Sequence, residues 1–199
     1  MLWRLVTGAV CAAGLIAAVS TDAAAQPRAR NYDQTVVGND PVARFFGFND
    51  SGSPVARTTV SFPENHKPGT VVIRTRERRL YLVLGNGQAL RYGIGVGRDG
   101  FGWGGVMRVS AKREWPDWTP PEQMLRRRPD LPRHMPGGPD NPLGARALYL
   151  GSSLYRIHGS NEPDTIGQAV SSGCFRLTNA DVIDLYNRVP VGATVIVQQ

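Results

Sequence analysis

The feature that most constrains the fold is a succession of short β-type runs, broken by a glycine-rich turn, between residues 70 and 112. Residues 70–74 and 79–84 are dominated by Val, Ile and Leu, and residues 88–96 carry apolar side chains at alternate positions. This period of two predicts strands with one buried face. Residues 85–87, Gly-Asn-Gly, predict a hairpin turn, because both residue types tolerate the positive φ that such turns require.

Further strands are predicted along the rest of the chain. Residues 107–112 continue the sheet, residues 147–157 form a second hairpin, and residues 192–197 form a closing strand. The pattern predicts about six or seven strands in a mostly antiparallel β-sandwich or barrel with minor α content, because an alternating α/β sheet would need a helix between successive strands.

One firm helix is predicted at residues 179–189, near the C-terminus. Thr178 and Asp181 resemble a capping box in which Asp replaces Glu, and Pro190 stops the helix. Apolar side chains three or four positions apart give this helix one face that is suited to burial.

The first 25 residues have the layout of a secretory signal peptide. Arg4 precedes an apolar run from Leu5 to about Val19, and small residues up to Ala25 offer a cleavage site. The run is short for a bilayer span, which needs about 20 apolar residues. We therefore predict an exported protein of the periplasm or cell envelope. An uncleaved anchor and a lipoprotein modified at Cys11 are the alternatives.

The rest of the chain is predicted to consist of a leader at residues 26–69 and one domain at residues 70–198. The leader is rich in turns, with a short helix near residues 40–46 and a strand near residues 58–62. A domain of this length can build its own core. We expect a monomer.

The charge favours an anionic partner. Removal of the signal peptide leaves the formal net charge at +7, because one basic and one acidic residue are lost with it. Positive charge attracts anions, and the export signal points to an envelope polymer and away from nucleic acid. The basic residues are almost all Arg, so a solvated surface encoded by a GC-rich genome explains the charge equally well.

A glycine-rich motif and a proline-rich insert stand out in the middle of the chain. Residues 95–100 formally match the Gly-x-Gly-x-x-Gly dinucleotide fingerprint, which must open a helix. Residues 101–105, Phe-Gly-Trp-Gly-Gly, cannot form a stable helix, so we predict a loop and no cofactor. Residues 115–143 contain Trp115 and Trp118. They form either a lid or wall over a site or a packed surface loop that the tryptophans anchor.

Cys174 is the one cysteine left after signal-peptide removal, so an intramolecular disulfide is excluded. His158 lies upstream at a predicted strand end, and a nearby imidazole can lower the pKa of a thiol. Ser172 and Gly173 precede the cysteine, and successive backbone amides there can bind an oxyanion. Arg176 lies on the same side of an extended segment and suits a carboxylate. A buried structural thiol is the alternative.

Two other chemistries fit the residues less well. The three histidines and Cys174 lack the ligand-pair spacing of a zinc site, so no metal is predicted. A serine mechanism through Ser172 lacks the Gly-x-Ser-x-Gly context of a nucleophile elbow.

Residues 157–160 and 166–177 resemble the catalytic block of the L,D-transpeptidases, the YkuD-like family. The family pattern is His-Gly-Thr/Ser followed by Ser-x-Gly-Cys-hydrophobic-Arg. The resemblance extends over residues 70–198. Phe175 stands where Ile or Val is usual, and the loop after Gly100 lacks the common Thr-Pro-x-Gly.

The resemblance implies an exported cysteine enzyme that acts on peptidoglycan stem peptides. Cys174 would attack a carbonyl of a donor tetrapeptide, release D-alanine and pass the acyl group to an amine. His158 would accept the thiol proton, and the carbonyl of Gly159 would orient it. The amides of residues 172–174 would form the oxyanion hole. Arg176 would hold the site or bind a substrate carboxylate, and Trp118 would contact substrate.

Three functions remain open at this point. The first is transpeptidation, in cell-wall biogenesis and with sensitivity to carbapenems. The second is hydrolysis on the same scaffold, with water as the acceptor of the shared acyl-enzyme. The third is a non-enzymatic wall-binding protein in which the cysteine is inert.

Overall fold

The computed structural model describes residues 53–199. The predicted signal peptide and the helix near residues 40–46 lie outside this part. The elements in chain order are β1 (Thr58–Ser61), β2 (Val71–Arg74), β3 (Arg79–Gly85), β4 (Gln88–Gly93), β5 (Val96–Gly97), β6 (Gly105–Glu114), α2 (Glu122–Arg127), β7 (Arg146–Leu150), β8 (Arg156–His158), the 3-10 turn η2 (Pro163–Thr165), β9 (Ala169–Ser171), β10 (Phe175–Arg176), α3 (Asn179–Arg188) and β11 (Thr194–Gln198).

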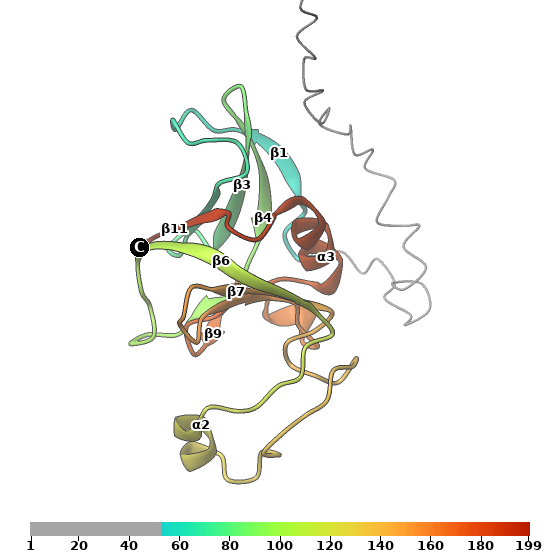
Figure 1. Cartoon of the computed structure of the whole chain (residues 1–199). Helices are drawn as coiled ribbons and strands as arrows, with labels where there is room; N and C mark the ends of the chain where they lie inside the picture. Colours follow the sequence, from blue (N-terminus) through green and yellow to red (C-terminus); the bar gives the residue numbers. More distant parts are fainter. Residues whose placement is uncertain (1–52) are drawn as a thin grey trace, which may run out of the picture. The chain divides into compact units, whose positions relative to one another are not determined.

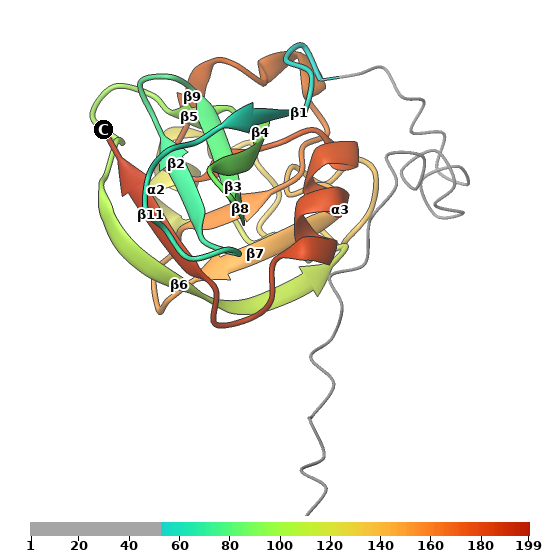
Figure 2. The ribbon, with the colours of Figure 1, turned by 90° about the horizontal axis from the view of Figure 1, so that it is seen from above.

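The strands form a strongly curved sheet with few helices around it (Figure 1, Figure 2), so the predicted mostly-β class is confirmed. Nine strands follow the order β1-β4-β3-β2-β11-β6-β7-β8-β10, and β5 pairs separately with β9. The predicted strand count was too low, because β5 and β10 have two residues each and β9 has three. Antiparallel pairs dominate, but β2–β11, β8–β10 and β5–β9 are parallel.

The first hairpin has the predicted turn. Gly85, Asn86 and Gly87 all have positive φ, at 94°, 52° and 69°. The single strand predicted at residues 88–96 is divided instead into β4 and β5. The division falls at Gly95, whose N–H and carbonyl both bond to the backbone of Arg176, at 2.9 and 3.0 Å.

β1 extends the sheet upstream of the predicted domain start at residue 70. It pairs with β4, with Thr59 beside Leu90. Phe62, the residue after β1, belongs to a small buried cluster with Tyr81, Val83 and Val72. The larger core cluster includes Leu80, Leu82, Leu90 and Tyr92. Because β3 and β4 contribute to two clusters, burial is not confined to the single face that the alternation predicted.

α3 has the predicted cap and the predicted apolar face. The Thr178 hydroxyl accepts a hydrogen bond from the N–H of Asp181 at 3.2 Å. Val182, Leu185 and Val189 are fully buried in the main core. Figure 2 shows the helix lying against the strands near β7, so it closes the core on that side.

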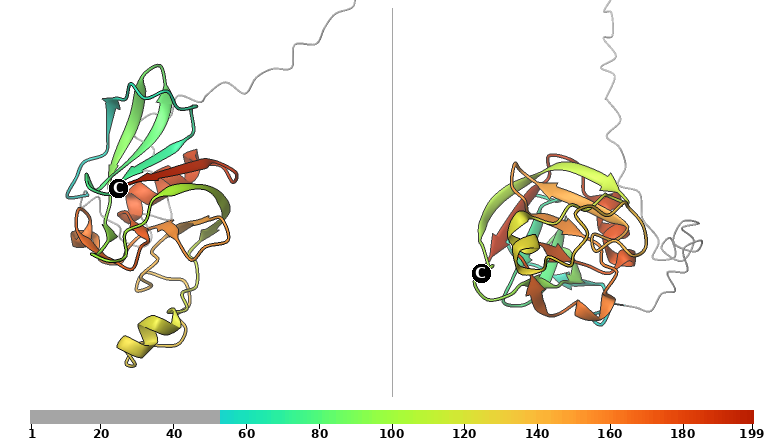
Figure 3. Two further views of the ribbon diagram at one scale, coloured as in Figure 1. Left: turned by 90° about the vertical axis from the view of Figure 1, so that its left-hand side faces the viewer. Right: turned by 90° about the horizontal axis from the view of Figure 1, so that it is seen from below.

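The proline-rich insert leaves β6 and returns to β7, and it extends away from the sheet in two arms of chain that carry α2 (Figure 1, Figure 3). α2 follows the Pro pair, as predicted, and has no buried residue. Asn141 fastens the base of the insert, because its amide nitrogen donates to the carbonyls of Pro116, Met135 and Pro136 at 3.1, 3.3 and 2.9 Å.

Candidate active site

The stretch around Cys174 is a tight loop between β9 and β10, which we call the nucleophile loop (residues 171–174). The buried Ser171 closes it: its hydroxyl donates to the carbonyl of Cys174 at 2.6 Å and accepts the N–H of Gly173 at 3.2 Å. Gly173 has φ +103°, and a Cβ there would lie 2.7 Å from the ring of Tyr155. Glycine is therefore the residue type that fits position 173, directly before the cysteine.

Trp103 belongs to the glycine-rich loop that follows β5, and it contacts the nucleophile loop. Its indole N–H donates to the carbonyl of Gly173 at 2.9 Å. Its ring stacks on Tyr155, with centroids 4.5 Å apart, and also contacts Phe175. The backbone that carries the cysteine is thus hydrogen-bonded to one ring of a stacked aromatic pair.

The pairing of β8 with β10 sets the thiol beside the predicted base. The strands are parallel, with Phe175 beside Ile157 and Arg176 beside His158. Cys174 therefore lies level with Arg156. Because side chains alternate along a strand, residues 156 and 158 share one face with residues 174 and 176. The register thus places Cys174, directly before β10, on the same face as His158 of β8, although 16 residues separate them in the sequence. The thiol itself donates to the carbonyl of Leu154 at 3.7 Å.

His158 is oriented by its own neighbour. The ring is 4% exposed, and Nδ1 donates to the carbonyl of Gly159 at 2.7 Å, the contact that the resemblance implies. Since Nδ1 carries the proton, Nε2 is the basic nitrogen of the neutral ring. A Cβ at Gly159 would lie 2.3 Å from the side chain of Asn179, so glycine is required here too.

Both groups are neutral near pH 7. Burial, reinforced by the charge of Arg176, lowers the pKa of His158 to about 3. Burial raises the pKa of the Cys174 thiol, and the backbone and guanidinium of Arg156 oppose that rise. The resting site is thus a thiol and an imidazole rather than a thiolate–imidazolium pair.

Comparison with known proteins identifies the family of this chain. The family model of the L,D-transpeptidase catalytic domain (YkuD) matches residues 68–197. The chain belongs to this family. A protein of Escherichia coli named "Probable L,D-transpeptidase ErfK/SrfK" is 39% identical over 142 residues, which cover 67% of this chain and 44% of that protein. "Probable L,D-transpeptidase YbiS" of the same species is 38% identical over 160 residues, or 73% of this chain and 51% of that protein.

The chain spans about half the length of these curated relatives. Among solved structures, an L,D-transpeptidase from Mycobacterium smegmatis is 17% identical with a TM-score of 0.53, and the match covers 65% of this chain and 58% of that one. At that identity the likeness shows the fold alone.

A structure from Brucella melitensis, described as a probable carnitine operon oxidoreductase, is 45% identical with a TM-score of 0.50, over 74% of this chain and 96% of that one. The oxidoreductase description concerns that protein. In this L,D-transpeptidase family member, residues 95–100 form β5 and a loop, and they open no helix. The predicted loop is therefore present between β5 and β6, at residues 98–104.

Arg176 lies beside the site, with its guanidinium directed to Glu162 at 3.1 Å. Among the described residues, the N–H groups of Ser172 and Cys174 have no hydrogen-bond partner, whereas the N–H of Gly173 is engaged by Ser171. The two unpaired amides are therefore the available donors in the nucleophile loop.

Trp118 lies in the insert. Its side chain is 9% exposed, and its N–H and carbonyl both bond to the backbone of Met135 at 2.8 Å. None of the contacts described for residues 53–199 joins Trp118 to Cys174. The structure shows Trp118 as part of the packing of the insert, and a substrate contact stays a prediction.

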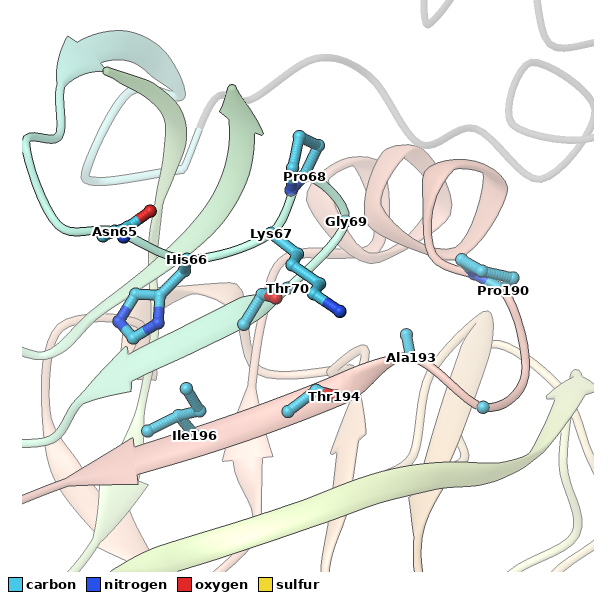
Figure 4. Close-up of a pocket in the computed structure, with 11 residues that line it drawn as sticks. Asn65, His66, Lys67, Pro68, Gly69, Thr70, Pro190, Ala193, Thr194 and Ile196 are labelled. Carbon is cyan, nitrogen blue, oxygen red and sulfur yellow. The ribbon is translucent and has the colours of Figure 1, made fainter. Parts of the chain in front are cut away.

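A separate concavity of about 500 Å³ lies between residues 65–70 and the connection from α3 to β11 (Figure 4). Figure 4 shows the Lys67 ammonium extending past Thr70 toward Pro190. No residue of the nucleophile loop lines it. Between residues 53 and 199, no three His, Cys, Asp or Glu side chains are grouped as metal ligands, and every helix is too short or too polar to span a bilayer.

Sequence reasoning missed Trp103, Tyr155 and Arg156 as parts of the site. Tyr155 and Arg156 immediately precede the recognised Ile-His-Gly stretch, so their position was a usable signal. Trp103 gave no such signal, because its contact with the nucleophile loop joins residues 70 positions apart.

Proposed function

We propose that this member of the L,D-transpeptidase family is a peptidoglycan L,D-transpeptidase in which Cys174 is the nucleophile and His158 the base. One observation carries the proposal. His158 presents a neutral ring, fixed through Nδ1 by Gly159, on the same sheet face as Cys174. A base held in one tautomer beside a thiol is the arrangement that nucleophilic catalysis needs.

In the first step, Nε2 of His158 takes the thiol proton as Sγ attacks the carbonyl of the donor stem. The amides of Ser172 and Cys174 bind the oxyanion. The tetrahedral intermediate collapses to a thioester. His158 returns the proton to the departing amine of D-alanine. The lowered pKa of His158 and the raised pKa of Cys174 favour proton transfer that accompanies attack.

In the second step, the amine of an acceptor stem attacks the thioester. His158 accepts a proton from that amine and passes it to the sulfur of Cys174. A new amide forms and the free thiol is restored. Water in place of the amine gives hydrolysis, so the acceptor decides between transfer and trimming.

We further propose that the chain is exported and works as a monomer at the cell wall. The support is the signal-like composition of residues 1–25 and the positive charge of the chain. Fractionation of cells that express the whole chain tests the location. Recovery with cytosolic proteins would contradict export.

The deciding experiment incubates the chain with a disaccharide-tetrapeptide donor and an amine acceptor, followed by mass spectrometry. Cross-linked product is expected from the wild type and none from Cys174→Ala. Trimmed peptide alone would show a hydrolase. Equal products from both proteins, or no mass added to Cys174 by a carbapenem, would show that the thiol is inert.

A further inference from the structure

A basic cleft of about 480 Å³ adjoins the nucleophile loop on the side of the glycine-rich loop. The turn between β2 and β3 forms one wall and residues 97–103 form the other. Gly173 and Phe175 line the cleft, but Cys174 does not. The cleft therefore reaches the residues on both sides of Cys174 in the sequence.

Positive side-chain charge exceeds negative side-chain charge in the cleft, which the last residue, Gln199, also lines. Arg76, Arg78 and Arg98 line it and are exposed, whereas Asp99 is the one acidic side chain among its lining residues. Among the described residues no carboxylate forms an ion pair with any of these three arginines. Arg78 donates to the carbonyl of Gly167 at 2.8 Å, which orients its side chain at the cleft. A carbonyl carries no net charge, so the guanidinium keeps its positive charge.

Aromatic rings complete the cleft. The guanidinium of Arg98 lies over the ring of Phe101, 4.4 Å from its centroid. Arg127 of α2 reaches the same ring at 5.7 Å, so the insert adds a further positive charge at this edge. Stacked guanidinium groups keep their N–H donors free for a carboxylate, which they bind through two parallel hydrogen bonds.

The cleft is mechanically joined to the nucleophile loop. The N–H of Arg98 donates to the carbonyl of Ser171 at 3.0 Å, and the indole of Trp103 donates to Gly173 at 2.9 Å. A Cβ at Gly97 would lie 3.2 Å from the Cα of Gly173. A ligand in the cleft thus rests on the same backbone that positions the thiol.

We propose that this cleft is a second substrate subsite that binds the free carboxylates of an acidic peptide while another part of the same ligand lies at Cys174. The proposal rests on the proposed function. A peptide suits the cleft because guanidinium donors and aromatic surface occur together in it, as carboxylates and methylene groups do in a peptide. Its volume admits a short segment rather than a folded partner.

The test measures binding of a peptidoglycan disaccharide-tetrapeptide to the Cys174→Ala chain by calorimetry, so that turnover is absent. Arg76→Gln combined with Arg98→Gln is expected to raise Kd at least tenfold and to reduce the salt dependence of binding. Arg113→Gln is the matched control, because Arg113 is exposed on β6 and bonds only to a neighbouring carbonyl. It should leave Kd unchanged. Thermal melting of each variant verifies folding.

An unchanged Kd in the double variant would overturn the subsite. So would Arg-dependent binding of inorganic polyphosphate that the tetrapeptide fails to displace, because the cleft would then serve a phosphate polymer. Thioester formation at Cys174 in the wild type tests the proposed function separately. If the thioester forms but the arginine substitutions leave Kd unchanged, the subsite proposal alone is wrong. If Kd depends on them but no thioester forms, the proposed function fails and the subsite stands.

Discussion

The nucleophile loop and the proline-rich insert are both irregular segments, yet they are held in opposite ways. In the loop, the Ser171 hydroxyl bonds to the carbonyl of Cys174 and the N–H of Gly173, and Trp103, stacked on Tyr155, bonds to the carbonyl of Gly173. In the insert, the hydrogen bonds concentrate at the base around Asn141, and α2 buries nothing. Density of buried contacts, rather than regular secondary structure, therefore separates the rigid part from the part that can move.

The difference between the two segments separates the region proposed for chemistry from the region that can change conformation. A nucleophile and its base must be held in position within a fraction of an ångström. Here the sheet and the stacked rings of Trp103 and Tyr155 restrict the position of the nucleophile loop. The insert can change conformation without moving them, since its contacts with the sheet are few. Variants in the loop should therefore act on rate, and variants in the insert should act on local order.

The largest effect is expected from His158→Gln. The variant removes the basic nitrogen but keeps a side chain of similar polarity. Acylation of Cys174 should slow by roughly 10²–10⁴-fold, the usual contribution of a general base. Stopped-flow measurement of carbapenem acylation tests this. A rate within threefold of the wild type would remove His158 from the mechanism.

Gly173→Ala should follow, with acylation slowed roughly 100-fold, because displacement of a reacting atom by about 1 Å costs that much. The new methyl would meet Tyr155 at 2.7 Å and move the thiol. Gly167→Ala is the matched control. Gly167 also has positive φ, +89°, but nothing lies within 4 Å of the added methyl. Equal losses in both variants would attribute the effect to backbone strain alone.

The pH dependence of stability gives the next effect. The folded pKa of His158 is about 3, against an ordinary value of 6.5. Between these values the unfolded chain binds a proton that the folded chain does not. The contribution of His158 to stability is therefore complete above pH 6.5 and falls as the pH drops toward 3, by at most about 1.4 kcal/mol per pH unit. Denaturant titrations should show this slope in the wild type and a reduced slope in His158→Gln.

Asn141→Ala should cost about 1–3 kcal/mol where the insert meets the sheet, because three carbonyls lose a buried donor. Hydrogen exchange should rise in residues 116–136 and stay unchanged in the nucleophile loop. Asn161→Ala, which removes a single exposed hydrogen bond to Asp140, is the control. Faster exchange around Cys174 would show that the two regions are not independent.

The smallest effect is expected from Glu122→Gln. Glu122 pairs with Arg126 at 3.5 Å on α2, and both side chains are exposed. Such helical pairs contribute about 0.3–0.5 kcal/mol. Neither the melting temperature nor the acylation rate should change measurably. A clear loss of either would show that α2 stabilises the protein although it has no buried residue.

The sequence predicted the elements whose determinants are local. The Gly-Asn-Gly turn, the capped helix after Thr178 and the Pro-led α2 follow from residues that act on their immediate neighbours. The family resemblance also identified Cys174, His158 and the carbonyl of Gly159 as a set. The domain boundary at residue 70 stays a prediction, although β1 joins the sheet upstream of it.

What escaped prediction depends on contacts between distant residues. The parallel pairing of β2 with β11 joins segments more than a hundred residues apart, and no periodicity encodes that choice. The division of β4 from β5 depends on Arg176, and the role of Trp103 depends on Gly173. A pattern within one segment cannot show which remote backbone will compete for its hydrogen bonds.

Under the proposed function, the parallel register of β8 and β10 also makes the thiol of Cys174 a reporter of correct folding. Cys174 and His158 share a face only in the observed pairing, and a slip of one residue would turn one of them to the opposite face. Under the proposed function, a misfolded molecule would then keep its cysteine but lose the proposed reactivity toward acylating β-lactams. Counting labelled molecules against total thiol would therefore give the native fraction in a preparation, without any substrate.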